Sequence, residues 1–172
     1  MNEPPVKTQS AELSISTRAG KFIARYSERG LAGLSFPPVG RVSPRAAQKT
    51  GVPATILRWH RTTTTALKNA LAGREPKNFP PLDLSGGTTF QQNVWRALRK
   101  ISRGKTCSYG EIARRIGKPK AGRAVGGACG ANPIPIFVPC HRVLAANKKT
   151  GGFSCGLNWK LKVLALEGIS LQ

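Results

Sequence analysis

The sequence lacks the features that mark membrane-spanning, secreted and disulfide-linked proteins. None of its apolar runs approaches the length that a membrane span needs. The N-terminal stretch MNEPPVKTQS has no apolar signal core, so we expect a protein that is not secreted. Only four cysteines occur, and without a signal peptide free thiols are the default state. With 172 residues and 40% hydrophobic content, the chain predicts one or two small folded domains.

Paired metal ligands are also missing. Structural zinc needs about four ligands, usually cysteines or histidines in pairs at short spacing. The sequence contains no C-x-x-C, His60 stands in a segment without cysteine, and the first half has no cysteine at all. The pair Cys140 and His141 has no second pair nearby. We therefore predict no metal site.

Acidic residues are scarce. The chain has 7 Asp and Glu against 28 Lys and Arg, which gives a formal net charge of +21. From Ser85 onward the only acids are Glu111 and Glu167, against fifteen Lys and Arg. A field of this sign attracts polyanions and matches the electrostatic footprint of a nucleic-acid-binding protein. A charged surface that serves only solubility is the alternative, and charge alone does not exclude it.

The first half is predicted to form a small unit of strands and one helix. Residues 11–36 alternate apolar and polar positions around Gly20 and Gly30, which is typical of two or three short antiparallel strands. Residues 37–53 are rich in Pro, Gly and Arg and indicate a loop. Residues 54–73 predict a helix in their second half that ends at the final glycine, because the threonine run before it is a poor helix former.

The second half follows a linker at residues 75–87 and is predicted to contain a helix-turn-helix. Its first helix has a capping box of Thr89 and Gln92, and the next begins with Ser108 and Glu111, a second capping box. A tight Gly-Pro turn then leads into AGRAVGGACGA, which keeps helical spacing of its apolar residues.

The segment beyond the helix-turn-helix is predicted to be extended, because its prolines forbid a helix. IFVPC and HRVLA indicate short extended segments, NKKTGG a turn and FSCG a return strand, which together suggest a hairpin or wing. LNWKLKVLALEG then predicts a closing helix. Its inward residues are expected to be Leu157, Leu161, Leu164 and Ala165.

The predicted helix AGRAVGGACGA is unusually rich in glycine. Gly122, Gly126, Gly127 and Gly130 each cost roughly 1 kcal/mol of helix stability relative to alanine. Small residues would let the helix lie in a groove too narrow for larger side chains, with Arg123 as the one long side chain near its start. Tight packing against another helix inside the protein explains the glycines equally well, so both interpretations stay open.

Cys140 lies in the stretch NPIPIFVPCHRV. A free cysteine is often only a small buried hydrophobe, but here prolines fix the backbone around the thiol, which suggests positioning. A nucleophilic Cys140 needs a base, and His141 follows directly. Since neighbours on a strand point to opposite faces, either the backbone turns there or a water bridges the two. An acid should orient the histidine, and with Glu111 used in its capping box Glu167 is the candidate.

Four stretches, taken in order, resemble a known family. SYGEIARRIG, AGRAVGGACGANPIPIFVPCHRV, GGFSCGL and LEG resemble the O6-alkylguanine-DNA alkyltransferases, also called methylated-DNA–protein-cysteine methyltransferases. The resemblance covers residues 88–170 strongly and rests only on overall layout in the first 80 residues. It implies an α+β fold with a small N-terminal α/β domain of antiparallel strands over residues 1–80, RNase H-like in the family. It implies a C-terminal winged helix-turn-helix-like domain for DNA binding and catalysis over residues 85–172.

The resemblance further implies DNA repair by direct reversal. The alkyl group of O6-alkylguanine in double-stranded DNA would move once and irreversibly to Cys140, after base flipping and without a cofactor. Glu167 would orient His141, His141 would deprotonate Cys140 through a water, and Tyr109 would protonate N3 of the departing guanine. We expect the Cys140 sulfur to be ionised inside a cavity that an everted purine enters.

The resemblance also assigns residues to the DNA contact and to the substrate pocket. Arg123 would fill the stack after the damaged nucleotide rotates out, and Asn132 would support the turn that holds the active-site segment. The DNA-binding set is Tyr109, Ala121, Arg123, Ala124 and Gly126, and the pocket set is Asn132, Pro135, Val143, Phe153 and Ser154. We expect a monomer in solution, cytoplasmic in a bacterium and nuclear in a eukaryote.

The sequence departs from the family pattern at two positions. Phe153 stands where tyrosine is usual, so substrate preference is expected to shift, and Cys155 stands where glycine is common and is expected to be inert.

A non-enzymatic DNA-binding module, either a lesion-flagging relative or a winged-helix regulator, is the main alternative. The intact motif around Cys140 argues against it, because the flagging relatives lack that thiol. A cysteine hydrolase is disfavoured, because nothing suggests a peptide cleft and the charge suits DNA.

Overall fold

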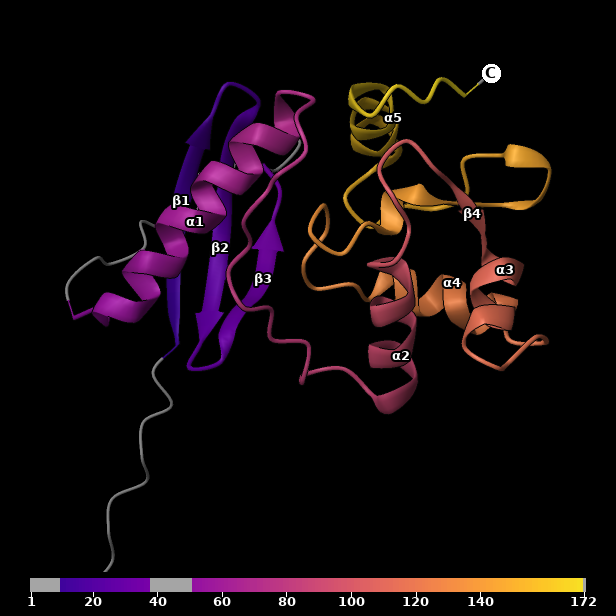
Figure 1. Ribbon diagram of the computed structural model, residues 1–172, viewed down its shortest axis with the longest axis horizontal. Helices are drawn as coiled ribbons and strands as arrows, with labels where there is room; N and C mark the ends of the chain where they lie inside the picture. Colours follow the sequence, from indigo (N-terminus) through magenta and orange to yellow (C-terminus); the bar gives the residue numbers. More distant parts are fainter. Residues whose placement is uncertain (1–9, 38–50, 172) are drawn as a thin grey trace, which may run out of the picture.

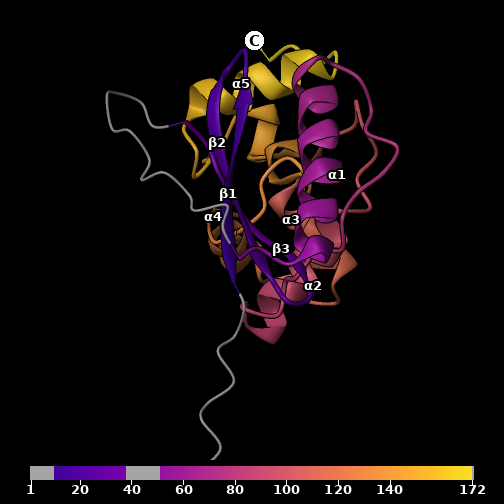
Figure 2. The ribbon, with the colours of Figure 1, turned by 90° about the vertical axis from the view of Figure 1, so that its left-hand side faces the viewer.

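The computed structural model describes residues 10–37 and 51–171. Residues 38–50 of the expected loop lie outside these described residues. The two described ranges hold no helix that is both long enough and apolar enough for a membrane crossing. Figures 1 and 2 show a sheet with one long helix on its face, beside a second body made mainly of helices. This arrangement confirms the expected α+β class.

The sheet contains the three antiparallel strands predicted from the alternating pattern. They are β1 (Ala11–Thr17), β2 (Gly20–Ser27) and β3 (Gly30–Ser35), in spatial order β1-β2-β3. Gly20 and Gly30 begin the second and third strands at φ +119° and +146°, where a side chain would be strained. Alternate residues are buried along β1 and β2, as the period of two requires: Leu13, Ile15, Phe22, Ala24 and Tyr26.

The long helix α1 (Ala54–Leu71) covers one face of this sheet. It includes the whole threonine run, so the prediction of a helix only in the second half was wrong. Thr63 is fully buried and its hydroxyl donates to the Trp59 carbonyl one turn earlier, at 2.8 Å. Burial of Ala66 and Leu67 against the sheet outweighs the weak propensity of threonine.

Helix α2 (Thr89–Leu98) opens the second body, one residue earlier than predicted. Its capping box is formed by Thr88 and Gln91, and the Gln92 side chain instead donates to the Gly87 carbonyl at 2.8 Å. The spacing of apolar residues identifies the buried face of a helix but not its first residue, which explains the error.

The helix-turn-helix is present as predicted. Helix α3 (Tyr109–Arg115) begins with the Ser108 and Glu111 capping box, and α4 (Gly122–Gly130) packs against it. Strand β4 (Cys107–Ser108) lies just before α3. The Trp95 indole of α2 donates to the Ala128 carbonyl of α4 at 2.8 Å, which fixes α4 from behind.

The predicted hairpin wing is wrong. Cys140–Arg142 form a short 3-10 helix, η1, and β5 (Val143–Leu144) pairs in parallel with β4. A second 3-10 segment, η2 (Ala146–Lys148), follows, and FSCG is not a strand. The parallel pairing satisfies the backbone of β5 across 36 residues of sequence, a non-local contact that local pattern does not reveal.

Helix α5 (Leu157–Leu166) closes the described chain, but its buried face differs from the prediction. Leu157 and Leu161 are 47% and 41% exposed, and Ala165 is also exposed. The buried residues are Lys160, Val163 and Leu164, so only Leu164 was assigned correctly. The error arose because a lysine, not a leucine, occupies the inward position.

The two bodies meet along β3 and α5. The Leu34 amide of β3 donates to the Pro133 carbonyl at 2.8 Å, just upstream of the proline-rich segment. The ring of Phe36 lies 5.0 Å from Trp159 of α5 and 6.2 Å from Phe153. The first body therefore braces the segment that leads to Cys140.

Candidate active site

Cys140 is presented by two consecutive turns. Pro139, with φ −79° and ψ 63°, forms an inverse γ-turn in which the Cys140 amide donates to the Val138 carbonyl at 2.8 Å. Cys140 then begins η1, and the Arg142 amide donates to the Pro139 carbonyl at 3.0 Å. The backbone turns here, so the strand geometry that would place His141 on the opposite face does not apply.

Asn132 holds this turn from inside. Its side-chain nitrogen donates to the Val138 carbonyl at 2.7 Å and to the Cys140 sulfur at 3.0 Å. Its side-chain oxygen accepts from the Ile134 amide at 3.0 Å. Both donors and the acceptor of a buried amide are thus used. The side chain fixes both the backbone that precedes Cys140 and the sulfur itself.

The Cys140 sulfur borders a small pocket of about 110 Å³. Tyr109 of α3 and Phe153 stand among its walls. The other lining residues are small or carry a thiol: Gly126, Cys129, Gly130, Cys140 and Gly152. A flat group entering here would meet two aromatic rings and the helix α4, with the sulfur at the wall.

The surroundings of Cys140 favour the protonated thiol in the free protein, whereas an ionised sulfur was expected from the sequence. Cys140 is 3% exposed, and this burial raises the pKa of its thiol to about 11. The hydrogen bond from Asn132 and the charge of Lys160 act in the opposite direction, toward the thiolate. A nucleophile in this setting must lose its proton as the reaction proceeds rather than beforehand.

His141 and Glu167 form a buried pair behind the cysteine. The His141 Nε2 lies 3.0 Å from a Glu167 carboxylate oxygen. Burial lowers the pKa of His141, so its ring is neutral near pH 7 and able to accept a proton. Its other ring nitrogen, Nδ1, is buried and has no hydrogen-bond partner within residues 10–37 and 51–171. That nitrogen is the atom of the pair left to take a proton.

Arg142 completes the group and was not assigned a role from sequence. Its guanidinium donates to both oxygens of Glu167, at 2.9 and 2.8 Å, and to the Ile101 carbonyl at 2.5 Å. Although burial alone would raise it, the hydrogen bonds from His141 and Arg142 hold the pKa of Glu167 at about 2. Glu167 is therefore a fixed negative charge at the back of the imidazole.

Tyr109 stands at the first position of α3 and is half-buried at the pocket. Burial raises the pKa of its hydroxyl above the usual value, and the Gly152 backbone hydrogen-bonds to it. The hydroxyl therefore keeps its proton at neutral pH and is available as a donor. A Cβ added to Gly151 would lie 2.8 Å from this hydroxyl, so the loop at this glycine presses closely on the tyrosine.

The glycines of α4 leave a surface of small residues on its exposed face. A Cβ added at Gly122, Gly127 or Gly130 would meet nothing within 4 Å, and one at Gly126 would only touch the Tyr109 ring at 3.8 Å. Internal packing therefore does not require these glycines. The inward face holds Val125, Ala128 and Cys129, whereas the solvent face presents Arg123, Ala124, Gly127 and Gly130. This leaves an open surface of small residues next to the pocket.

The remaining predicted site residues differ in how deeply they are buried. Val143 is buried in β5 and paired with β4, and Pro135 is buried beside Val138. Neither borders the pocket. Ser154 is exposed, with its hydroxyl 3.9 Å from the Cys155 sulfur, and Ala121 is the half-buried residue that precedes α4.

Lys160 is a second residue that sequence reasoning missed. It is fully buried in α5, three and four residues before Val163 and Leu164. The signal was present in the sequence, because this spacing places a lysine on the apolar face of the helix.

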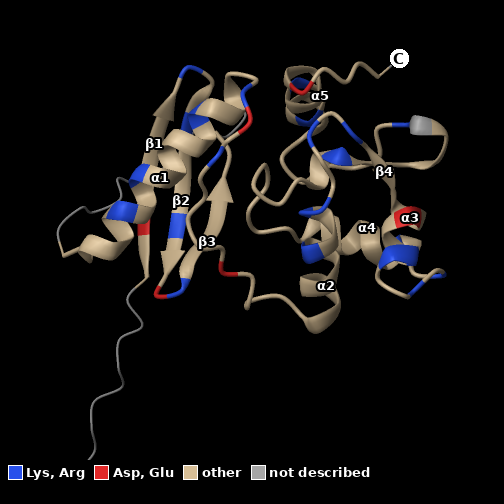
Figure 3. Ribbon diagram, viewed as in Figure 1, with Lys and Arg blue, Asp and Glu red and all other residues tan. Residues whose placement is uncertain are grey.

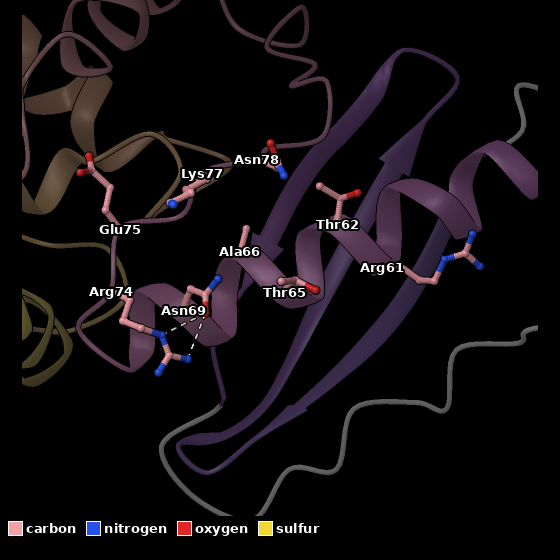
Figure 4. Close-up of a pocket in the computed structure, with 9 residues that line it drawn as sticks. All are labelled: Arg61, Thr62, Thr65, Ala66, Asn69, Arg74, Glu75, Lys77 and Asn78. Carbon is pink, nitrogen blue, oxygen red and sulfur yellow. Dashed lines mark hydrogen bonds between the residues drawn. The ribbon is translucent and has the colours of Figure 1, made fainter.

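Three larger hollows of the described residues have no cysteine in their walls. One of about 600 Å³ lies along α1 and the following linker, and Figure 4 shows its polar lining with Arg61 extending away from the rest. Arg74 there donates twice to the side-chain oxygen Oδ1 of Asn69, at 3.2 and 3.0 Å. Figure 3 shows basic residues over both bodies, with acids in the second body only at α3 and α5. The surface charge is thus broadly positive, and the thiol pocket is the place for chemistry.

Comparison with known proteins connects this site to an activity. Residues 89–169 match the family model described as 6-O-methylguanine DNA methyltransferase, DNA binding domain. A methylated-DNA–protein-cysteine methyltransferase of Methanosarcina acetivorans is 50% identical over 152 residues, 87% of this chain and 92% of that protein. The protein of the same name from Mycobacterium tuberculosis H37Rv is 58% identical over 86 residues, 50% of this chain and 52% of its own length. The crystal structure of Mycobacterium tuberculosis OGT in complex with DNA superposes with a TM-score of 0.74 and 37% identity, over 91% of each chain.

Proposed function

This chain belongs to the family of methylated-DNA–protein-cysteine methyltransferases, and we propose that it repairs DNA by moving an alkyl group from O6 of guanine to Cys140. The observation that carries this proposal is the Cys140 thiol at the wall of a small pocket beside α4, with the His141 and Glu167 pair behind it. The partner is double-stranded DNA that contains an O6-alkylguanine, in the bacterial cytoplasm or the eukaryotic nucleus.

The transfer begins with removal of the thiol proton. His141 takes it at Nδ1, through a water, and Glu167 stabilises the imidazolium that forms. The sulfur attacks the alkyl carbon, the new S–C bond forms, and the C–O6 bond breaks with its electron pair left on guanine. Asn132 keeps the sulfur aimed while the charge moves, because its amide donates to the sulfur.

The leaving guanine would carry a negative charge unless it gained a proton. Tyr109 holds its proton at neutral pH and stands at the pocket wall, so it donates that proton to N3. A neutral base then leaves. The product on Cys140 is a thioether, which water does not readily cleave, so each molecule acts once and needs no cofactor.

The approach to DNA uses the open face of α4. The alkyl carbon of a stacked guanine cannot meet the sulfur in line, so the nucleotide must rotate out, at a cost of a few kcal/mol. The small residues of α4 suit close approach to the minor groove, and Arg123 is the exposed side chain able to fill the gap in the stack. The net positive charge supplies phosphate attraction. We expect a monomer to be sufficient.

Intact-mass measurement after incubation with a duplex carrying O6-methylguanine tests the proposal. The protein should gain one methyl group, Cys140→Ala should gain none, and Cys155→Ala, which removes a neighbouring thiol, should react like the wild type. An unchanged wild-type mass with tight and selective binding of the modified duplex would instead indicate a lesion-flagging protein. A gain that persists in Cys140→Ala would place the acceptor elsewhere.

A further inference from the structure

Lys160 is a buried cation without a buried anion as its partner. The residue has no exposed surface, and no acidic side chain within the described ranges forms an ion pair with it. Its ammonium donates to the carbonyls of Val143 at 2.7 Å and Gly152 at 3.3 Å, and also to that of Thr150. All three N–H donors are therefore used by backbone oxygens. Burial lowers the pKa of Lys160 from its usual value, because it disfavours the charged form, and the three carbonyl contacts stabilise that form.

The three carbonyls belong to two segments that enclose the reacting sulfur. Val143 lies in β5, directly after the turn that holds Cys140 and His141. Thr150 and Gly152 belong to the loop that presses on the Tyr109 hydroxyl and contributes Gly152 to the pocket wall. Lys160 thus ties the loop that presses on the proposed proton donor to the segment that carries the nucleophile.

The ammonium also lies where it acts on charge at the sulfur. The titratable groups that interact electrostatically with Cys140 are Tyr109 of α3, Cys129 of α4, Cys155 of the loop and Lys160 of α5, and His141 follows it in η1. Lys160 is the group among them that lowers the pKa of both Cys140 and Cys129 by its charge. Glu167, the nearby anion, is already engaged by His141 and Arg142.

We propose that Lys160 is a positioning residue for the alkyl transfer, which ties the 150–152 loop to β5 and places a fixed positive charge near the Cys140 sulfur. The charge stabilises the thiolate that develops during attack, in an interior where such a charge acts strongly. The loop contact keeps Tyr109 and the pocket wall in place. This inference rests on the proposed function only for the guanine reaction, because the effect on the thiol is a property of the protein alone.

The charge is tested with a reagent that contains no guanine. Iodoacetamide alkylation of Cys140 is followed against pH by peptide mapping, in the wild type, in Lys160→Met and in Lys162→Met. Lys160→Met should raise the pH midpoint of alkylation by about one unit, because a neutral side chain no longer favours the thiolate. Lys162→Met removes an exposed charge of the same helix that sits over the Trp159 ring, and should leave the midpoint unchanged. Equal midpoints in all three proteins would overturn the role of the charge.

Lys160→Arg separates the charge from the loop contact, and carries the test alone if Lys160→Met does not fold. It should keep the wild-type midpoint, since a cation remains, and a midpoint raised by about one unit would overturn the electrostatic part. Its reaction with free O6-benzylguanine should be about 10-fold slower, because a planar guanidinium does not reproduce three contacts made by an ammonium. A wild-type rate would overturn the role in positioning the loop. If the wild type gains no methyl group from the O6-methylguanine duplex, the proposed function fails, while the iodoacetamide result still decides the effect of the charge.

Discussion

The two bodies of the molecule bury different kinds of side chain. Thr63 is the buried polar residue of the first body, and its hydroxyl is satisfied within α1. The second body buries Asn132, His141 and Lys160 around a thiol that is itself 3% exposed. Buried polar groups cost stability unless they are paired, and Nδ1 of His141 has no protein partner among the residues that the structure describes. The comparison teaches that the first body is built for stability and the second for chemistry.

The bodies are nevertheless joined where the chemistry needs support. The Leu34 amide of β3 holds the Pro133 carbonyl, and the next residues lead through the prolines to the turn at Cys140. Ile136 in that segment has φ +75°, a conformation that a β-branched residue rarely adopts. Such a conformation persists only where its surroundings impose it. The sheet therefore acts as the rigid support for a strained segment.

Glu167→Gln, in the second body, should cause the largest fall in the transfer rate. Glutamine cannot balance a positive imidazole, and it leaves the Arg142 guanidinium without a carboxylate. The single-turnover rate with free O6-benzylguanine should fall about 100-fold or more, as for loss of general-base assistance. Glu75→Gln, at an exposed acid of the linker, is the matched control and should react normally. An unchanged rate in Glu167→Gln would remove the carboxylate from the mechanism.

Leu67→Ala, in the first body, should lower the folding stability and leave the transfer rate unchanged. Leu67 is fully buried between α1 and the sheet, so its truncation should reduce the free energy of unfolding by about 2–5 kcal/mol. Thermal unfolding measures the loss, and the transfer rate is compared at a temperature where both proteins are folded. That rate should match the wild type. A large fall in rate of the folded variant would show that the division between a supporting and a reacting body is wrong.

Gly127→Leu should affect only the reaction with DNA. A Cβ added at this exposed position meets nothing within 4 Å, and leucine is a better helix former than glycine, so the melting temperature should not fall. On the exposed face of α4 the leucine would hold the helix away from a narrow groove. The rate with a duplex substrate should drop about 10-fold, whereas the rate with the free base should stay the same. Gly86→Leu, at an equally open position in the linker, serves as the control. Equal rates with the duplex would assign the glycines no role in DNA approach.

Periodic segments and short motifs were predictable, because their causes are local. The three strands, the Ser108 capping box and the helix-turn-helix all follow from residue spacing within a dozen positions. The stretch around Cys140 and the scarcity of acids were enough to select Glu167, and the structure brings it to His141. The start of α2 at Thr89 was displaced by one residue, because two threonines in sequence compete for the same capping position.

Features that depend on distant contacts were not predictable. The parallel pairing of β4 with β5 replaced the expected hairpin, since its partner strand lies before the helix-turn-helix. The inward face of α5 was misassigned because the carbonyls that satisfy Lys160 come from a loop and a strand elsewhere in the chain. The protonation state of Cys140 depends on its depth in the folded protein, which composition does not report. These three errors lie around the site, whereas those in α1 and at the start of α2 concern local helix signals.

The smallest expected effect is the loss of folding stability in acid, which can be compared for two carboxylates, Asp83 and Glu167. Asp83 of the linker, which is bound to the first body, accepts from Ser27 of β2 at 2.5 Å and from Ser85 at 2.6 Å. Burial alone would raise its pKa, but these hydrogen bonds lower it. The pKa of Glu167 is also depressed, to about 2. A carboxyl whose folded pKa lies below its unfolded value adds stability at neutral pH, and that stability is lost as pH falls through the folded pKa.

Denaturant unfolding across the acid range, with Glu167→Gln and Asp83→Asn, should separate the two carboxylates. Each variant should be less stable than the wild type near pH 7, and each difference should shrink below about pH 4.5, the usual range of carboxyl titration. The Glu167→Gln difference should persist to near pH 2, because the wild-type carboxyl stays ionised until then. The Asp83→Asn difference should be smaller at every pH, since Asp83 is less deeply buried than Glu167 and water screens its contacts. If the loss of unfolding free energy in Glu167→Gln did not change with pH, it would come from altered packing rather than from the lost charge. The two bodies would then not differ in their use of a buried charge.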